Sequence, residues 1–427
     1  MIERIHLKGF KSFLRAEANL GPLTLIVGTN ASGKSNIREA LRVVHGIGLG
    51  YPIADVLGEK YGPGGILQWR GIRGGAKEAA FENGGSFAIK VALRAPGNSS
   101  HKDQLLTYGV RVDVSSLKSG PRIVRESLYA SNSLVFDSHP KIDAPIQDSE
   151  HQIRVRYSKS GKQKKGSVRE FSSARPVLSQ LAGLQREQAS LRETCQAVLA
   201  ILASIRFLDL DPDAMRQPSQ PGQLILGDRG ENLSSVLQGI CLDDARRATL
   251  IEWLRALTPM DASDFAFRPD LMGRVLVHLV EASGFEVSAY SASDGTLRFL
   301  ALVAALLSED TGQIYFFEEF DNGIHPTRLH LLLDLVQRAS RDMNVQVIGT
   351  THNPALLAFL DDRARADALL VYRSEYFKGS NLVQIMSLPD AKEIVATQDL
   401  GKLYQAGWLE DAAILSGADA PGAADVG

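Results

Sequence analysis

Residues 23–36 read Leu-Thr-Leu-Ile-Val-Gly-Thr-Asn-Ala-Ser-Gly-Lys-Ser-Asn, and this stretch predicts the fold of the chain. Its apolar run is typical of a short buried strand, and apolar residues at helical spacing begin just after it. The loop between them has the pattern Gly-x-x-x-x-Gly-Lys-Ser. Its glycines let backbone N–H groups curl round a phosphate, its lysine reaches the β- and γ-phosphates, and its serine can bind Mg²⁺. The strand–loop–helix context disfavours a chance glycine-rich turn, so we expect nucleotide binding by Gly28, Asn30, Ala31, Ser32, Gly33, Lys34, Ser35 and Asn36.

The composition sets the broad class of protein. The 427 residues suffice for two or three compact units, and 44% hydrophobic with 22% charged residues is ordinary for a soluble globular chain. The formal net charge of −2 means that any nucleic-acid contact must come from a local basic patch. Cys195 and Cys241 fit neither a metal-binding spacing nor a disulfide framework. With no signal peptide and no apolar stretch long enough for a bilayer, we expect a cytoplasmic protein without a membrane partner.

Two later apolar runs end in side chains that suit phosphate chemistry. Residues 314–317 lead into Glu318 and Glu319, and residues 345–349 lead towards His352. In open α/β sheets, ligands bind at the carboxyl ends of the strands. We therefore expect both carboxylates beside a Mg²⁺–phosphate and His352 beside the γ-phosphate. The turn from Ser293 to Thr296 opens an apolar helix and offers a second place for an anion.

The remaining patterns divide the chain into three units and a tail. Alternating residues between Phe87 and Tyr157 predict antiparallel strands, and helical periodicity from about Pro176 to Met260 predicts a helical lobe. The expected fold is thus α/β, with an antiparallel β section and an inserted helical lobe. Its units are an N-terminal lobe (1–175), the helical lobe (176–262) and a C-terminal lobe (263–416). The Ala/Gly/Asp-rich residues 417–427 are expected to be a disordered tail.

A basic stretch between Tyr157 and Phe171 reads as a hairpin with a charged tip. It carries Lys159, Lys162, Lys164, Lys165 and Arg169 around two glycines. Such a tip is either a solvated, flexible turn or a contact to the phosphate backbone of DNA or RNA. The sequence leaves both interpretations open.

These pieces, in this order, resemble the ABC-type ATPase heads of the RecF and structural-maintenance-of-chromosomes (SMC) group. They look most like the short bacterial RecF-like "AAA family" ATPases, which have no coiled-coil arms. Gly9-Phe-Lys-Ser-Phe13 looks like the opening strand of those heads, and residues 28–35 match Walker A. Ser293-Asp-Gly-Thr296 resembles the signature turn. Residues 317–326, Phe-Glu-Glu-Phe-Asp-Asn-Gly-Ile-His-Pro, resemble Walker B plus the D-loop, and Thr351-His-Asn-Pro354 resembles the switch histidine.

The resemblance implies roles for particular residues. ATP and Mg²⁺ would be the ligands, and Ser293 and Gly295 of one subunit would close on the ATP of another, which makes a homodimer. Glu319 would deprotonate the attacking water. Glu318 stands where most members have aspartate, and its longer reach still allows a water-bridged Mg²⁺ contact. The Mg²⁺-sensing glutamine would be Gln180, with Gln68 as the alternative.

The resemblance also implies a function. We expect an ATP-hydrolysing switch in DNA repair or anti-phage defence, whose dimerisation controls DNA binding or a separate effector protein. A non-catalytic nucleotide-binding scaffold is the alternative that the Glu318 departure keeps open. A transport ATPase is disfavoured, because the signature turn departs from Leu-Ser-Gly-Gly-Gln and residues 10–13 look like the chromosome group.

Overall fold

A computed structural model describes residues 1–95, 103–116, 120–138, 151–157, 167–184, 189–257, 261–308, 313–343 and 345–416. Its centre is a six-stranded sheet with the order β12-β16-β17-β3-β18-β19. The strands are β3 (Leu23–Val27), β12 (Ile205–Leu208), β16 (Ile314–Phe317), β17 (Gln346–Thr350), β18 (Leu369–Ser374) and β19 (Phe377–Gln384). All neighbouring pairs are parallel except β18 and β19. This confirms the predicted α/β class.

The inner strands β3, β16 and β17 are buried along their whole length, which explains their largely apolar sequences. In β3, Leu25 and Val27 face one hydrophobic core and Ile26 faces the other. In β16, Phe316 and Phe317 divide between the two cores in the same way. The sheet is therefore the middle layer of the molecule, and the carboxyl ends of its strands lie at one edge.

The second layer is an eight-stranded antiparallel sheet with the order β11-β10-β9-β8-β7-β6-β1-β2. Its strands are β1 (Ile2–Phe10), β2 (Phe13–Asn19), β6 (Ser86–Ala95), β7 (Gln104–Asp113), β8 (Arg122–Ala130), β9 (Ser133–Asp137), β10 (Gln152–Tyr157) and β11 (Ser167–Ser172). This sheet shares one core with α1 (Lys34–Gly48), α3 (Val177–Ala182) and α4 (Ala189–Ala203). The predicted antiparallel section is confirmed.

The base of the basic hairpin is present, because β10 pairs with β11 from Gln152↔Ser172 to Tyr157↔Ser167. Arg169 lies in β11, 5.7 Å from the ring of Phe171. The four lysines at the expected tip, Lys159, Lys162, Lys164 and Lys165, lie outside the described residues, as do residues 417–427.

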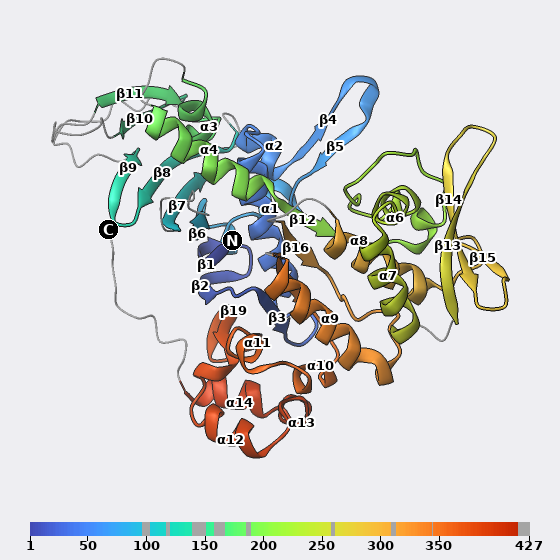
Figure 1. The fold of residues 1–427 in the computed structure, drawn as a ribbon. Helices are drawn as coiled ribbons and strands as arrows, with labels where there is room; N and C mark the ends of the chain where they lie inside the picture. Colours follow the sequence, from blue (N-terminus) through green and yellow to red (C-terminus); the bar gives the residue numbers. More distant parts are fainter. Residues whose placement is uncertain are drawn as a thin grey trace.

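The other elements lie around these two sheets (Figure 1). A short insertion after α1 contains α2 (Ile53–Leu57) and a projecting hairpin of β4 (Glu59–Tyr61) and β5 (Leu67–Arg70). A separate group comprises α5 (Pro212–Met215), α6 (Leu233–Ile240), α7 (Asp244–Leu257) and the antiparallel strands β13 (Ala262–Pro269), β14 (Val275–Glu281) and β15 (Glu286–Ser288). The chain continues through α8 (Asp294–Leu307), α9 (Leu329–Asp342), α10 (Ala355–Ala358), α11 (Asp362–Ala366), α12 (Ala391–Thr397), α13 (Leu400–Gln405) and α14 (Trp408–Leu415).

The middle of the chain differs from the prediction in one respect. The expected helical lobe also contains β12, which pairs in parallel with β16 at the edge of the central sheet. Its four residues follow directly on the apolar periodicity of α4, so the sequence pattern could not separate them. The central sheet takes strands from all three expected units, and the boundaries at 175 and 262 stay predictions. Every helix of the described residues falls short of the length and hydropathy that a membrane crossing needs.

Candidate nucleotide-binding site

The loop between β3 and α1 has a backbone that only particular residues can adopt. Gly28 and Gly33 have φ angles of 152° and 119°, in the region that favours glycine. A Cβ atom on Gly28 would lie 2.1 Å from the carbonyl oxygen of Val371. The hydroxyl of Ser32 is buried in this loop without a hydrogen-bond partner. A tight loop with an unsatisfied donor beside a helix N-terminus fits a bound phosphate.

Lys34 is the first residue of α1, and its side chain folds back onto the backbone of this loop. Its Nζ donates to the carbonyl oxygens of Gly28 at 2.6 Å and Thr29 at 2.9 Å. Burial lowers the pKa of Lys34, while the nearby carboxylates of Glu319, Glu318 and, more weakly, Glu410 act to raise it. The ammonium is thus shielded from water and directed at the loop, where it would offset phosphate charge.

Ser35 and Glu318 form an oxygen-donor pair between α1 and the end of β16. The Ser35 hydroxyl donates to Oε1 of Glu318 at 3.1 Å. Mg²⁺ prefers oxygen ligands and is commonly held by one or two carboxylates together with substrate phosphates and water. Because the described residues contain no cluster of three or more His, Cys, Asp and Glu side chains suited to a metal, the pair fits that mode rather than an all-protein cage.

Glu319 and His352 meet at the ends of neighbouring strands. Nε2 of His352 lies 3.2 Å from Oε1 of Glu319, and both side chains are partly exposed. Glu319 has a φ angle of 52°, which is costly for a residue with a side chain. Its backbone N–H donates to Oγ1 of Thr350 at 3.1 Å, which holds this conformation. The structure thus brings together the two residues predicted to act in catalysis.

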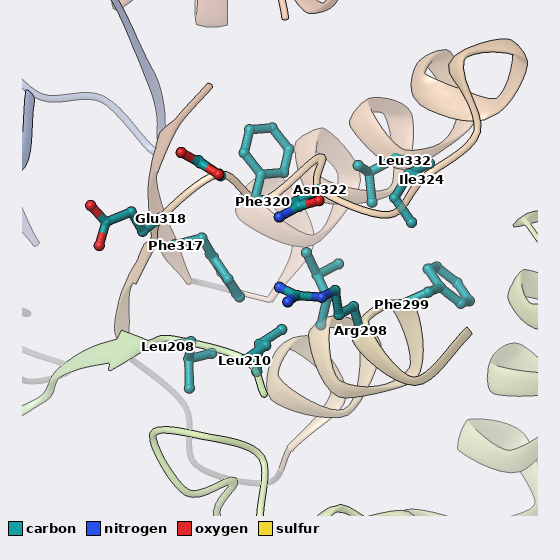
Figure 2. A pocket seen from close by; sticks show the side chains of 12 residues that line it. Leu208, Leu210, Arg298, Phe299, Phe317, Glu318, Phe320, Asn322, Ile324 and Leu332 are labelled. Carbon is teal, nitrogen blue, oxygen red and sulfur yellow. The ribbon is translucent and has the colours of Figure 1, made fainter. Parts of the chain in front are cut away.

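Ser293 caps α8, because its hydroxyl accepts from the backbone N–H of Thr296 at 3.2 Å. Gly295 is packed so closely on the D-loop that an added Cβ would lie 2.3 Å from the carbonyl oxygen of Gly323. The signature turn and the D-loop of one chain therefore form a continuous surface. Beside it, a pocket opens between α8 and the end of β16 (Figure 2), lined by Leu208, Leu210, Arg298, Phe299, Leu302, Phe317, Glu318, Glu319, Phe320, Asn322, Ile324 and Leu332.

Within the part of the chain that the structure describes, neither candidate glutamine forms a hydrogen bond to the Walker A residues. The amide of Gln180 accepts from the backbone N–H of Ser172 at 3.1 Å and donates to the carbonyl oxygens of Ser172 and Arg175. It thus fastens α3 to β11, and the prediction of Gln180 as a Mg²⁺ ligand is not supported by this placement. Gln68 lies exposed on β5, where it packs near Gly62.

Three residues at the site were missed by sequence reasoning. Arg38 follows Ser35 by one helical turn, and its Nε lies 3.7 Å from Oε2 of Glu318, so helical spacing could have indicated it. Tyr404 of α13 lies beside the backbone of Gly28, which acts to lower the pKa of its hydroxyl, and Glu410 of α14 lies near enough to Lys34 to affect its pKa. No local signal links these two residues to a loop at the other end of the chain.

The fold is that of P-loop NTPases of the ABC-ATPase head type. The chain belongs to the family described as "AAA domain, putative AbiEii toxin, Type IV TA system", whose model matches residues 23–358.

The similar proteins have related descriptions. An "ATP/GTP phosphatase" of Helicobacter pylori is 34% identical over 76 residues, which are 17% of this chain and only 20% of that protein. A crystal structure of an Smc head bound to the C-terminal winged-helix domain of ScpA superposes with a TM-score of 0.50 at 15% identity, over 92% of this chain and 99% of that one. This likeness supports the fold. An SMC head domain from Thermotoga maritima has a TM-score of 0.41 at 14% identity, over 90% and 98% of the two chains.

Proposed function

We propose that this chain binds ATP with Mg²⁺ at the Walker A loop and hydrolyses it. The observation that carries the proposal is the meeting of three strand ends: Lys34 and Ser35 follow β3, Glu318 and Glu319 follow β16, and His352 follows β17. The similarity to an ATP/GTP phosphatase of Helicobacter pylori supports the same activity.

In this mechanism, Glu319 accepts a proton from water as the water oxygen bonds to the γ-phosphorus and the bond to the β–γ bridging oxygen breaks. His352 contacts the same carboxylate at 3.2 Å and would fix its direction towards the γ-phosphate. Lys34 offsets charge on the phosphate oxygens. Ser35 and Glu318 would hold Mg²⁺, which would supply positive charge against the charge that develops on the phosphate oxygens.

Two variants separate binding from chemistry. Lys34→Ala should abolish ATP binding while the fold survives, because the buried ammonium is lost. Glu319→Gln should still bind ATP but hydrolyse it about 10²–10⁴-fold more slowly, because the general base is lost. Equilibrium dialysis with radiolabelled ATP and a phosphate-release assay measure the two effects. Tight ATP binding by Lys34→Ala would remove the Walker A assignment, and wild-type turnover by Glu319→Gln would remove that of the base.

We further propose that ATP-dependent homodimerisation makes this cytoplasmic ATPase a switch in DNA repair or anti-phage defence, controlling DNA binding or a separate effector protein. The toxin–antitoxin wording of the family description supports a defence role. Phosphate release with and without DNA tests the link to nucleic acid. ATP binding by the wild type without any phosphate release would instead favour the nucleotide-binding scaffold that Glu318 keeps open.

A further inference from the structure

The carboxylate of Glu318 has two partners on α1, Ser35 and Arg38, and Arg38 takes no part in the proposed hydrolysis. Oε1 faces the Ser35 hydroxyl at 3.1 Å, whereas Oε2 faces Nε of Arg38 at 3.7 Å. The two side chains of the ion pair are 14% and 27% exposed, for Arg38 and Glu318 respectively, so water screens the contact only in part. Since Ser35 and Arg38 lie one turn apart on α1, a single rigid helix positions both oxygens.

We infer that Arg38 is a positioning residue that holds the carboxylate of Glu318 in the orientation that Mg²⁺–nucleotide binding requires; this rests on the proposed function. A glutamate has one more rotatable bond than the aspartate usual at this position, so its carboxylate samples more orientations. An ion pair on Oε2 leaves Oε1 directed at Ser35. A shorter aspartate would need no such restraint, so the arginine compensates for the longer side chain.

Arg38 is itself held rigidly enough for this role. Its guanidinium lies 5.7 Å from the ring centroid of Phe207, on the strand next to β16. Arg42, one turn further along α1, lies 5.2 Å from the same ring and 5.3 Å from that of Trp69. Arg42 has no ion pair with Glu318 among the described contacts, so it shares the packing of Arg38 but not its contact with the carboxylate.

The test measures the Mg²⁺ concentration at half-maximal binding of a fluorescent ATP analogue to the full chain. Arg38→Gln should raise this concentration about three- to ten-fold. The Glu318 side chain then loses its ion pair, so Mg²⁺ binding alone must order it. Arg42→Gln, the matched control, should leave it unchanged although it also removes a cation from Phe207. In a Glu318→Asp background, adding Arg38→Gln should produce no further shift, because the restrained side chain is absent.

The outcomes separate this inference from the proposed function. If the wild type shows no Mg²⁺-dependent nucleotide binding, the proposed function fails. If the wild type binds as expected but Arg38→Gln leaves the Mg²⁺ midpoint unchanged, or shifts it equally in the Glu318 and Asp backgrounds, the positioning role is overturned. Should Arg38→Gln not fold, Arg38→Lys replaces it. A smaller shift is then expected, because the lysine keeps a positive charge near Glu318 although its ammonium cannot occupy the position of the arginine Nε. An unchanged midpoint again overturns the positioning role.

Discussion

At the scale of single residues, His45 shows how burial sets a protonation state. The imidazole lies on the inner face of α1, and its Nδ1 is 3.0 Å from the carbonyl oxygen of Leu202 in α4. Because a carbonyl only accepts, the neutral ring donates from Nδ1. Burial lowers the pKa of His45 to about 4, aided by the nearby Arg206 and Arg42 and opposed by the bond to Leu202.

This lowered pKa predicts a loss of stability in acid. An unfolded histidine has a pKa of about 6.5, so between that value and about 4 the unfolded chain binds the proton more readily. The free energy of unfolding should therefore decrease as the pH is lowered. For this group the decrease is about 2 kcal/mol between pH 7 and pH 5. Urea unfolding at both pH values should show that His45→Gln lacks this contribution, whereas His6→Gln, a change at a partly exposed histidine, keeps it. Equal pH dependence in wild type and His45→Gln would contradict the prediction.

At the scale of elements, α3 depends on a strand distant in sequence. Its N-cap, Pro176, supplies no side-chain acceptor. Instead the buried carboxyl of Glu126 in β8 accepts from the backbone N–H groups of Val177 at 2.7 Å and Leu178 at 2.8 Å. The hydroxyl of Tyr108 in β7 also donates to it, at 3.0 Å. The antiparallel sheet thus caps the helix, and burial raises the pKa of Glu126 to about 7.

Removing this cap should destabilise the junction strongly. Glu126→Ala leaves two buried N–H groups and one hydroxyl without a partner, at about 1–3 kcal/mol each, so we expect a loss of about 3 kcal/mol or more. Tyr108→Phe removes one bond without stranding the helix and should cost only about 1 kcal/mol. Urea unfolding measures both values, and hydrogen exchange at the first turn of α3 should quicken only in Glu126→Ala. An equal decrease in the free energy of unfolding for the two variants would show that the Glu126 cap on α3 does not stabilise the junction beyond one ordinary hydrogen bond.

At the scale of the whole molecule, the signature turn and the Walker A loop belong to distant parts of the chain. Ser293 and Gly295 begin α8, against the D-loop, whereas Lys34 begins α1 after β3. One chain has no evident need of a second anion-binding turn. In a dimer, each γ-phosphate could take donors from the opposite subunit, and hydrolysis would open the interface by removing the bridging phosphate.

A mixing experiment tests this shared site. Ser293→Arg should leave ATP affinity near that of the wild type but abolish ATP-dependent dimerisation and hydrolysis, because a bulky cation occupies the closing surface. Ser293→Thr, which retains an N-capping hydroxyl, is the control for loss of the cap on α8. Lys34→Ala is inactive for a different reason, so a mixture with Ser293→Arg should regain partial phosphate release through one intact composite site. A phosphate-release assay measures this hydrolysis. A wild-type rate for Ser293→Arg alone would rule out the dimer mechanism.

Sequence alone determined the class of the fold, and it predicted most of the candidate site residues. The Walker A loop, Glu318, Glu319 and His352 were predicted to lie close together, because each follows an apolar strand and the carboxyl ends of parallel strands meet at one edge of the sheet. The antiparallel strands were predictable for a similar reason, since alternation along a few residues already defines a half-buried strand. These patterns are local in sequence, so they can be interpreted without knowing which residues lie nearby in the folded structure.

Only the tertiary structure decided what surrounds those residues. It paired β12 with β16, tied Gln180 to the backbone of β11, and brought Arg38 to the second oxygen of Glu318. It also placed Tyr404 beside the backbone of Gly28. The chemistry of arginine, glutamine and tyrosine allows many partners, and the chain itself does not specify which one is near. That choice is made by the packing of whole helices and strands, where burial of apolar surface outweighs any single polar contact.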